Sequence, residues 1–135
     1  MAVALDSDAV VGFVDAADAL HAAADAAVRE LAGEQRLMVS VVTYAEVVTG
    51  ARVGHHDLGA VMGFFADVIS RIVPVDVEVA DRAAELRAAA SSLRMPDALI
   101  VATAELAPEV DTLLTGDRAV AKLRGLRCQV QLLSG

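Results

Sequence analysis

Four acidic residues follow apolar segments at widely separated points of the chain. They are Asp6, Glu46, Asp97 and Asp117. Asp6 and Asp117 come directly after predicted strands, and the strand ends of a parallel sheet meet at one edge, where α/β proteins form their sites. Asp97 and Glu46 lie in the first turns of predicted helices. We therefore expect four carboxylates to converge on one crevice.

Carboxylates held a few ångströms apart repel one another at low dielectric, so such a cluster must share protons or hold a cation. Ligands that are all oxygen favour the hard ions Mg²⁺ or Mn²⁺, which keep waters of their own. A bound ion lowers the pKa of a water, orients it towards a phosphorus atom and offsets charge on the leaving oxygen. The predicted chemistry is phosphodiester hydrolysis, and the choice between one ion and two stays open.

Taken singly, each acid has an ordinary structural explanation. An acid in the first turn of a helix is stabilised by the helix dipole, and Asp after a strand is common turn chemistry. We interpret Asp8, Asp57 and Asp76 in that way, as helix caps. What favours a shared site is the position of all four candidate acids at one end of the predicted sheet.

Short apolar runs alternate with segments of helical periodicity along the chain. The predicted strands are 3–5, 37–41, 71–75, 112–116 and 128–133, and the predicted helices are 9–15, 18–31, 44–53, 58–69, 77–90, 96–106 and 118–125. This order predicts an α/β fold with a mostly parallel central sheet of about five strands, flanked by helices on both faces. We expect residues 1–135 to form one domain, because the chain is too short for two.

Polar residues before the helices indicate where the helices start. Ser7 and Asp8 offer cap oxygens for the first helix, and Thr43 does so for the third. Pro96 fits the first position of its helix, where a missing N–H costs nothing, and this places Asp97 in the first turn.

The composition excludes several classes of protein. Only 3% of the 135 residues are aromatic although 56% are hydrophobic, which suits helices packed closely on a parallel sheet. A single cysteine, Cys128, excludes an internal disulfide and a cysteine-based metal site. No apolar run is long enough to span a membrane, and the N-terminus lacks the basic flank of a signal peptide, so we expect a cytoplasmic protein.

The formal net charge of −8 argues against binding nucleic acid by bulk electrostatics, because phosphate contacts come from Lys and Arg. The charges are unevenly distributed, however. After Asp117 the chain contains no acid and four basic residues, which are Arg118, Lys122, Arg124 and Arg127. The C-terminal edge is therefore locally basic.

The histidines and phenylalanines carry little functional signal. None of the three histidines has an acidic partner at an informative helical spacing, and His55 and His56 lie in a predicted loop. We therefore predict no catalytic histidine. Core packing is the default interpretation of Phe64 and Phe65, and a partner-binding groove or a dimer contact is the alternative.

Four segments resemble the motifs of the PIN-domain ribonucleases, most closely the VapC toxins of bacterial toxin–antitoxin pairs. The segments are LDSDAVVGFVD, SVVTYAEVVTGA, LRMPDALIVATA and LLTGDRAVAKL. Each contains one of the four candidate acids, and the resemblance runs from about residue 3 to about residue 133. The order of the four motifs is more specific than any one of them.

The resemblance implies that the four acids hold Mg²⁺ or Mn²⁺, with Asp6 and Asp97 as direct ligands. Ser7 and Thr115 match positions where the family often has hydroxyl residues, which would hydrogen-bond to the ligands. The sequence DSD departs from the family's pattern by an extra carboxylate, Asp8. This carboxylate either adjusts metal affinity or caps the helix, and we interpret it as a cap.

The resemblance also implies an activity and partners: a metal-dependent endoribonuclease that acts as a toxin, forms a homodimer, cleaves structured RNA and is inhibited by a cognate VapB-like antitoxin. The antitoxin's C-terminal segment would enter the acidic crevice, where an Arg could pair with the carboxylates. For RNA, the four basic residues after Asp117 are candidates for phosphate contacts, and a solvated helix face explains them equally well. No membrane partner is expected.

Two alternatives remain. A receiver-like signalling domain is also a small α/β protein that binds Mg²⁺, but it needs an aspartate at the end of its middle strand and a lysine at the end of a late strand. Here the corresponding strands end in VSVVT and LLTGD, and the only lysine, Lys122, lies in a predicted helix. A catalytically silent PIN-like protein that acts by binding a partner is the third interpretation, and the presence of all four acids argues against it.

Overall fold

The computed structural model describes residues 1–135, and its centre is a five-stranded sheet. The strands lie in the order β3-β2-β1-β4-β5, and every neighbouring pair is parallel. Their bounds are β1 (Ala2–Leu5), β2 (Arg36–Ser40), β3 (Arg71–Val73), β4 (Val110–Thr115) and β5 (Gln129–Leu132). The predicted parallel sheet of about five strands is confirmed, and β3, which precedes Pro74, is an edge strand.

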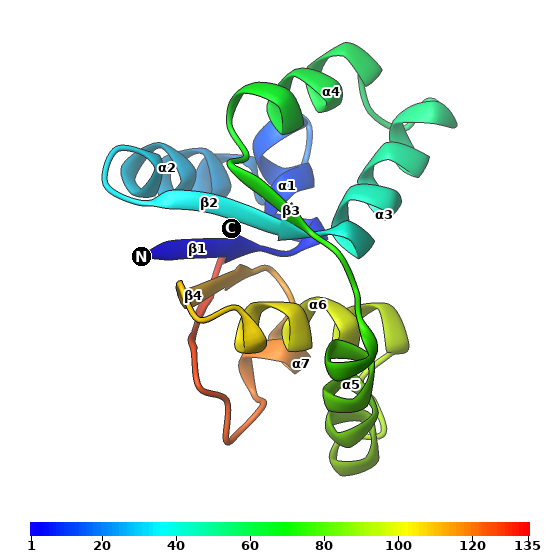
Figure 1. Ribbon diagram of the computed structural model, residues 1–135. Coiled ribbons are helices and arrows are strands. Elements are labelled where there is room, and N and C mark those ends of the chain that lie inside the picture. Colours follow the sequence, from blue (N-terminus) through cyan, green and yellow to red (C-terminus); the bar gives the residue numbers. More distant parts are fainter.

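Seven helices cover the two faces of the sheet. They are α1 (Ser7–Val14), α2 (His21–Ala32), α3 (Val41–Arg52), α4 (Leu58–Asp67), α5 (Val77–Ala89), α6 (Met95–Leu106) and α7 (Arg118–Ala121). Figure 1 shows the sheet nearly edge-on, with α1 to α4 on one side of it and α5 to α7 on the other. The predicted three-layer α/β architecture is therefore confirmed. No helix combines the length and apolar character that crossing a membrane requires.

The strand order reverses direction at the β1–β4 pair: β2 and β3 lie on one side of it, and β5 lies on the other. After β1 the chain enters α1 on one face of the sheet, and after β4 it enters α7 on the other face (Figure 1). Neighbouring strands that send their helices to opposite faces leave a crevice beyond their carboxyl ends. The fold thus provides a place for a site between α1 and α7.

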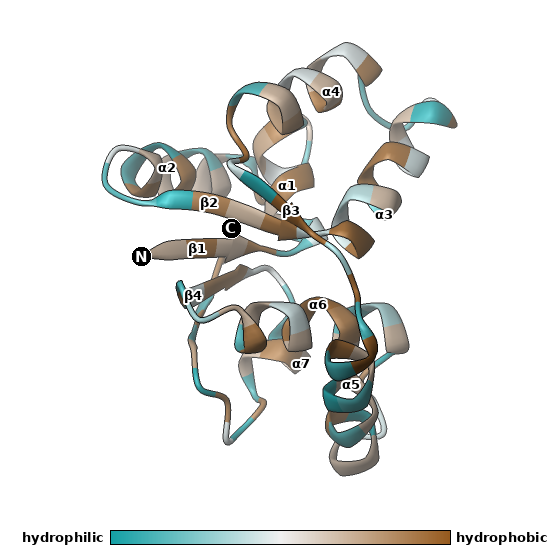
Figure 2. Ribbon diagram, in the orientation of Figure 1, coloured by the Kyte–Doolittle hydropathy of each residue, from teal (hydrophilic) through white to brown (hydrophobic).

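Two apolar clusters, one on each face of the sheet, form the core. In β1 the side chains alternate: Ala2 and Ala4 join the cluster with α5 and α6, whereas Val3 and Leu5 join the cluster with α1 to α4. All four are buried, and Figure 2 shows β1 as hydrophobic along its length. A strand buried on both faces carries no polar residue until it ends, which is why VAL leads directly into Asp6.

The first helix begins one residue after β1, and Asp6 itself is its N-cap. The Oδ1 atom of Asp6 accepts a hydrogen bond from the backbone N–H of Ala9 at 3.0 Å. The prediction that Ser7 and Asp8 cap this helix is wrong, because both lie inside its first turn. An Asp at the strand end already supplies the acceptor that the first turn needs.

The third helix also begins earlier than predicted. Ser40, the last residue of β2, caps α3 by accepting a hydrogen bond from the Val42 N–H at 3.1 Å. Thr43, the predicted cap, is instead fully buried within the first turn. At the other predicted starts, Asp57 and Asp76 are confirmed as caps, and Pro96 occupies the second helical position rather than the first.

A buried carboxylate on α6 fastens the loop that leads into β5. Glu105 is only 7% exposed, and it binds the guanidinium of Arg82 and accepts a hydrogen bond from the Arg127 N–H at 3.0 Å. The guanidinium of Arg127 in turn donates to the carbonyls of Glu105, Ala107 and Val110 at 2.7–2.9 Å. Burial opposes the ionisation of Glu105, but Arg82 and Arg127 outweigh it and hold the pKa of Glu105 below its ordinary value.

Replacing Glu105 by Ala should therefore destabilise the fold by about 2–3 kcal/mol, because two arginine groups lose a charged acceptor. Since the pKa of Glu105 is lowered on folding, its contribution is present above the unfolded pKa and is lost as the pH falls through the folded value. Urea unfolding at pH 7 and pH 3 would measure both effects, and the difference from wild type should shrink at pH 3. Glu85→Ala is the matched control, since Glu85 pairs with the same Arg82 at 3.3 Å but is exposed, and it should cost less than about 1 kcal/mol.

Candidate active site

The four predicted acids lie around the carboxyl ends of β1, β2 and β4. Asp6 follows β1, Asp117 follows β4 and caps α7, Glu46 lies in the second turn of α3, and Asp97 lies in the first turn of α6. The charges of Asp117 and Glu46 both raise the pKa of Asp97, and the charge of Asp117 raises that of Asp6. Each of the four carboxylates therefore lies within electrostatic reach of at least one other, while their joint role as a site stays a prediction.

Asp6 is the most deeply buried of the four, at 7% exposure. Its carboxylate accepts one hydrogen bond from the Ala9 N–H and another from the hydroxyl of Thr115. Burial raises the pKa of Asp6 to about 7, the two hydrogen bonds partly oppose this rise, and the charges of Asp8 and Asp117 add to it. No basic side chain of the protein pairs with Asp6, so at neutral pH its negative charge is poorly compensated.

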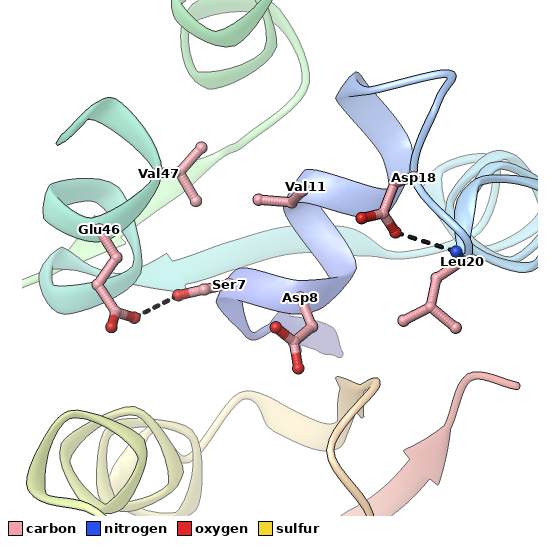
Figure 3. Close-up of a pocket in the computed structure, with 7 residues that line it drawn as sticks. All are labelled: Ser7, Asp8, Val11, Asp18, Leu20, Glu46 and Val47. Carbon is pink, nitrogen blue, oxygen red and sulfur yellow. Dashed lines mark hydrogen bonds between the residues drawn. The ribbon is translucent and has the colours of Figure 1, made fainter. Parts of the chain in front are cut away.

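Two hydroxyl residues hold the acids in place. The buried Thr115 bridges two of them, since its hydroxyl donates to Asp6 and accepts from the Asp117 N–H at 3.0 Å. The hydroxyl of Ser7 donates to Oε1 of Glu46 at 2.6 Å and so joins α1 to α3 (Figure 3). Both hydroxyls predicted to support the acids therefore contact them, while a role beside a metal stays a prediction.

Asp97 is the only one of the four acids that has a basic side chain as a partner. The Arg94 Nε lies 3.5 Å from Oδ2 of Asp97, and the Arg94 side chain is 77% exposed. Burial raises the pKa of Asp97, Arg94 opposes the rise, and the charges of Asp117 and Glu46 add to it. An exposed arginine is screened by water, so it compensates the crevice only weakly.

The structure does not bring these acids together as a finished metal centre. No group of three or more His, Cys, Asp or Glu side chains is close enough to hold a metal ion. The donor chemistry nevertheless suits a hard cation, because only carboxylates and hydroxyls are present. A cavity of about 10 Å³ lies between Asp6 and Asp97, with Ile100 and Val101 in its wall, and this is room for about one water-sized species.

Asp8 belongs to this site although the sequence was interpreted otherwise. It is not a cap, and partial burial, followed by the charges of Asp117 and Asp97, raises its pKa. Figure 3 shows its carboxylate pointing away from α1 towards the crevice. The sequence signal that could have revealed this was its position as the second residue of the first helix, because side chains in that turn lie beside the crevice.

The predicted basic residues divide into two groups. Arg118, Lys122 and Arg124 are exposed and lie in or just after α7, next to Asp117. Arg127 is also exposed, but its guanidinium donates to four backbone carbonyls and so serves the fold. His21 contacts the Gly12 carbonyl at 2.8 Å. His56 contacts Asp15, which lies far away in the sequence, at 3.2 Å, an acidic partner that the spacing of residues did not reveal.

A model of the PIN domain family matches residues 3–126. Since this match spans most of the sequence, the chain belongs to the PIN domain family. A search of curated protein sequences found no match.

Several similar solved structures come from toxin–antitoxin systems. A chain of VapBC2 from Rickettsia felis, solved with a promoter DNA fragment, matches with a TM-score of 0.77 and 16% identity over 99% of this chain and 100% of that one. A toxin–antitoxin complex from Klebsiella pneumoniae matches at 0.68 and 23% identity over 90% and 92%. VapC20 of Mycobacterium tuberculosis, a toxin that cleaves the sarcin-ricin loop, matches at 0.68 and 20% identity over 89% and 95%. At these identities the likeness shows a shared fold.

The raised pKa of Asp6 predicts that the metal-free protein loses stability as the pH rises. The folded protein keeps a proton on Asp6 up to about pH 7, whereas an unfolded Asp releases it near ~3.9. The stability contributed by this group is therefore complete below about pH 4 and declines as the pH approaches 7.

Asp6→Asn should abolish this decline. At ~1.36 kcal/mol per pKa unit, the variant should exceed wild type at pH 8 by up to about 4 kcal/mol and differ little at pH 4. Urea unfolding with chelator present would measure it, and Asp57→Asn, which changes the exposed cap carboxylate of α4, is the control. An identical pH profile for Asp6→Asn and wild type would contradict the interpretation.

Proposed function

We propose that this protein is a metal-dependent endoribonuclease, a VapC-like toxin that hydrolyses RNA phosphodiester bonds. The observation that carries the proposal is the poorly compensated carboxylate of Asp6, buried beside other carboxylates and sharing a water-sized cavity with Asp97. A nearby cation stabilises the ionised form of a buried acid in such surroundings. Membership of the PIN domain family supports the same conclusion.

In this proposal Asp6 and Asp97 bind Mg²⁺ or Mn²⁺ directly, and Glu46 and Asp117 complete the acidic quartet. A bound divalent ion supplies an activated water and offsets charge on the leaving oxygen. Thr115 holds the Asp6 carboxylate against rotation, and Ser7 does the same for Glu46. Such hydrogen bonds to ligands fix their orientation and tune their basicity.

A nuclease accounts for the residues better than the two alternatives do. A receiver-like domain needs a lysine at the end of a late strand, but Lys122 follows the short helix α7, and β2 ends in Ser40 rather than an aspartate. A silent PIN-like binding protein has no need for a buried carboxyl group with a pKa near neutrality, which costs stability when it ionises.

The proposed partners follow from the solved relatives. The VapBC structures are complexes of toxin and antitoxin, which supports a cognate VapB-like antitoxin for this chain as well. A net charge of −8 suits a basic partner segment, whose arginine side chains would pair with the crevice carboxylates. We further propose that the toxin is a homodimer, that its substrate is RNA, as it is for VapC20, and that it acts in the cytoplasm.

Protein freed of antitoxin should cleave RNA with Mg²⁺ or Mn²⁺ and stop when a chelator is added. Asp97→Asn and Asp6→Asn should each lower the cleavage rate by about 10³-fold, equivalent to about 4 kcal/mol of transition-state stabilisation. Calorimetric titration with Mn²⁺ should show the loss of metal binding independently of activity. Undiminished cleavage by both variants would refute the metal assignment.

Asp76→Asn is the matched control for that experiment. Asp76 caps α5 by accepting from the Val79 N–H at 2.9 Å, and Asn caps equally well. The control therefore removes one carboxylate from a helix start outside the crevice and should keep wild-type activity. Thermal unfolding of all three variants would separate loss of chemistry from loss of fold.

The exposed basic residues beside α7 should contribute to RNA affinity. Arg118→Ala, Lys122→Ala and Arg124→Ala should each weaken binding to all RNA sequences alike and lower the slope of log affinity against log salt by about 1. Binding is measured without divalent ions, so that the RNA stays intact. Arg36→Ala, which removes an exposed arginine at the amino end of β2, should leave both quantities unchanged.

A further inference from the structure

A second cavity, of about 210 Å³, opens beside the acidic crevice. It lies between α1, α3 and the turn that joins α1 to α2 (Figure 3). Its lining residues are Ser7, Asp8, Val11, Asp18, Leu20, Glu46 and Val47. It shares Glu46 and Ser7 with the proposed active site, so whatever occupies it lies next to the reacting phosphate.

The floor of this cavity is apolar. Val11 of α1, Val47 of α3 and Leu20 of the turn line it and come from three different elements. Figure 3 shows the Val11 and Val47 side chains pointing towards each other. Gly116 leaves room for the Leu20 side chain, because a Cβ at residue 116 would overlap the Leu20 Cδ1. An apolar surface of this kind accepts the face of a planar ring.

The polar groups around the floor are hydrogen-bond acceptors. Ser7 has already donated its hydroxyl hydrogen to Glu46. One oxygen of Asp18 accepts from the Leu20 N–H at 3.0 Å, which leaves the other oxygen free, and Figure 3 shows it directed towards Val11. Asp8 accepts no hydrogen bond within the protein. A ligand that fits must therefore present donors.

We propose that this cavity is a nucleobase pocket that selects a base with an exocyclic amino group, guanine best of all, beside the scissile phosphate. The inference rests on the proposed function. Guanine presents an N–H and an amino group side by side on its Watson–Crick edge, which is the pattern that a carboxylate accepts. Single-stranded RNA is recognised in this way, by stacking on a side-chain surface and hydrogen bonds to base edges.

Uracil fits this lining poorly. Its single N–H lies between two carbonyl oxygens, which would face the carboxylates of Asp8 and Asp18 and repel them. An arginine side chain from a protein partner would also bring donors. A guanidinium on a flexible chain, however, needs no broad floor built from three elements, so the apolar part of the lining favours a base.

Nuclear magnetic resonance of the metal-free protein tests the pocket without requiring cleavage. Guanosine should shift the methyl signals of Val11, Leu20 and Val47 by its ring current, and it should bind about tenfold more tightly than inosine, which lacks the amino group, or uridine. Equal binding of the three nucleosides, or no methyl shifts, would overturn the proposal. Methyl shifts with an arginine peptide but with none of the nucleosides would assign the cavity to a protein partner instead.

Cleavage of a random-sequence RNA pool supplies the second test. Wild type should favour guanine at one fixed position relative to the cut, and Asp18→Asn, which places an amide N–H₂ in the cavity, should reduce that preference about tenfold while cleavage continues. Glu30→Gln, which removes an exposed charge of α2 that makes no hydrogen bond, is the control and should keep the preference.

The outcomes separate the two proposals. Metal-dependent cleavage without any base preference, or a preference that Asp18→Asn leaves unchanged, would overturn the pocket and leave the nuclease intact. Absence of cleavage in wild type would overturn the nuclease, and the methyl shifts alone would then decide whether the cavity binds a base.

Discussion

The burial of the Asp6 carboxyl group is the constraint on which the site depends. This group is held by the first turn of α1 through the Ala9 N–H and by β4 through the hydroxyl of Thr115. Burial of a charge without a partner is costly, and the raised pKa of about 7 expresses that cost. The two hydrogen bonds donated to the Asp6 carboxyl group favour its ionised form and offset part of this cost. A bound cation would offset more of it.

A comparison within the protein supports this view. Asp6 and Glu105 are both 7% exposed, yet folding raises the pKa of Asp6 and lowers that of Glu105. The difference lies in their partners: Glu105 has two arginines, whereas Asp6 has hydroxyl and amide donors and further acids around it. The protein therefore supplies compensating charge where a carboxylate holds the fold together. At the crevice no basic side chain compensates the Asp6 carboxylate, and the proposed chemistry needs a cation there.

The parallel sheet makes this arrangement possible with few residues. β1 is buried on both faces and ends at Asp6, while its neighbour β4 ends at Thr115, directly before the loop that carries Asp117. Helices α3 and α6 then approach from opposite faces with Glu46 and Asp97. Apolar strand interiors and polar strand ends thus follow from one architecture: the sheet provides the buried core, and the candidate site residues lie just beyond the ends of its strands.

The alternation of apolar runs and helical repeats was sufficient to predict the parallel sheet, its flanking helices and the end at which the acids gather, because burial on two faces restricts which residues a strand can contain. Other features depended on tertiary contacts between distant residues. Ser40 displaced Thr43 as a cap, Asp8 left its expected capping role for the crevice, and Arg127 bound backbone carbonyls across the loop into β5. Partners of this kind depend on how the helices and strands pack together. The spacing of residues along the chain does not reveal that packing. The amino-acid sequence by itself indicated the edge of the sheet at which Asp6, Glu46, Asp97 and Asp117 lie, because strand ends carry the polar residues. Only the folded chain decided that Asp8 joins them, which carboxylates are buried or paired, and how much charge remains unbalanced.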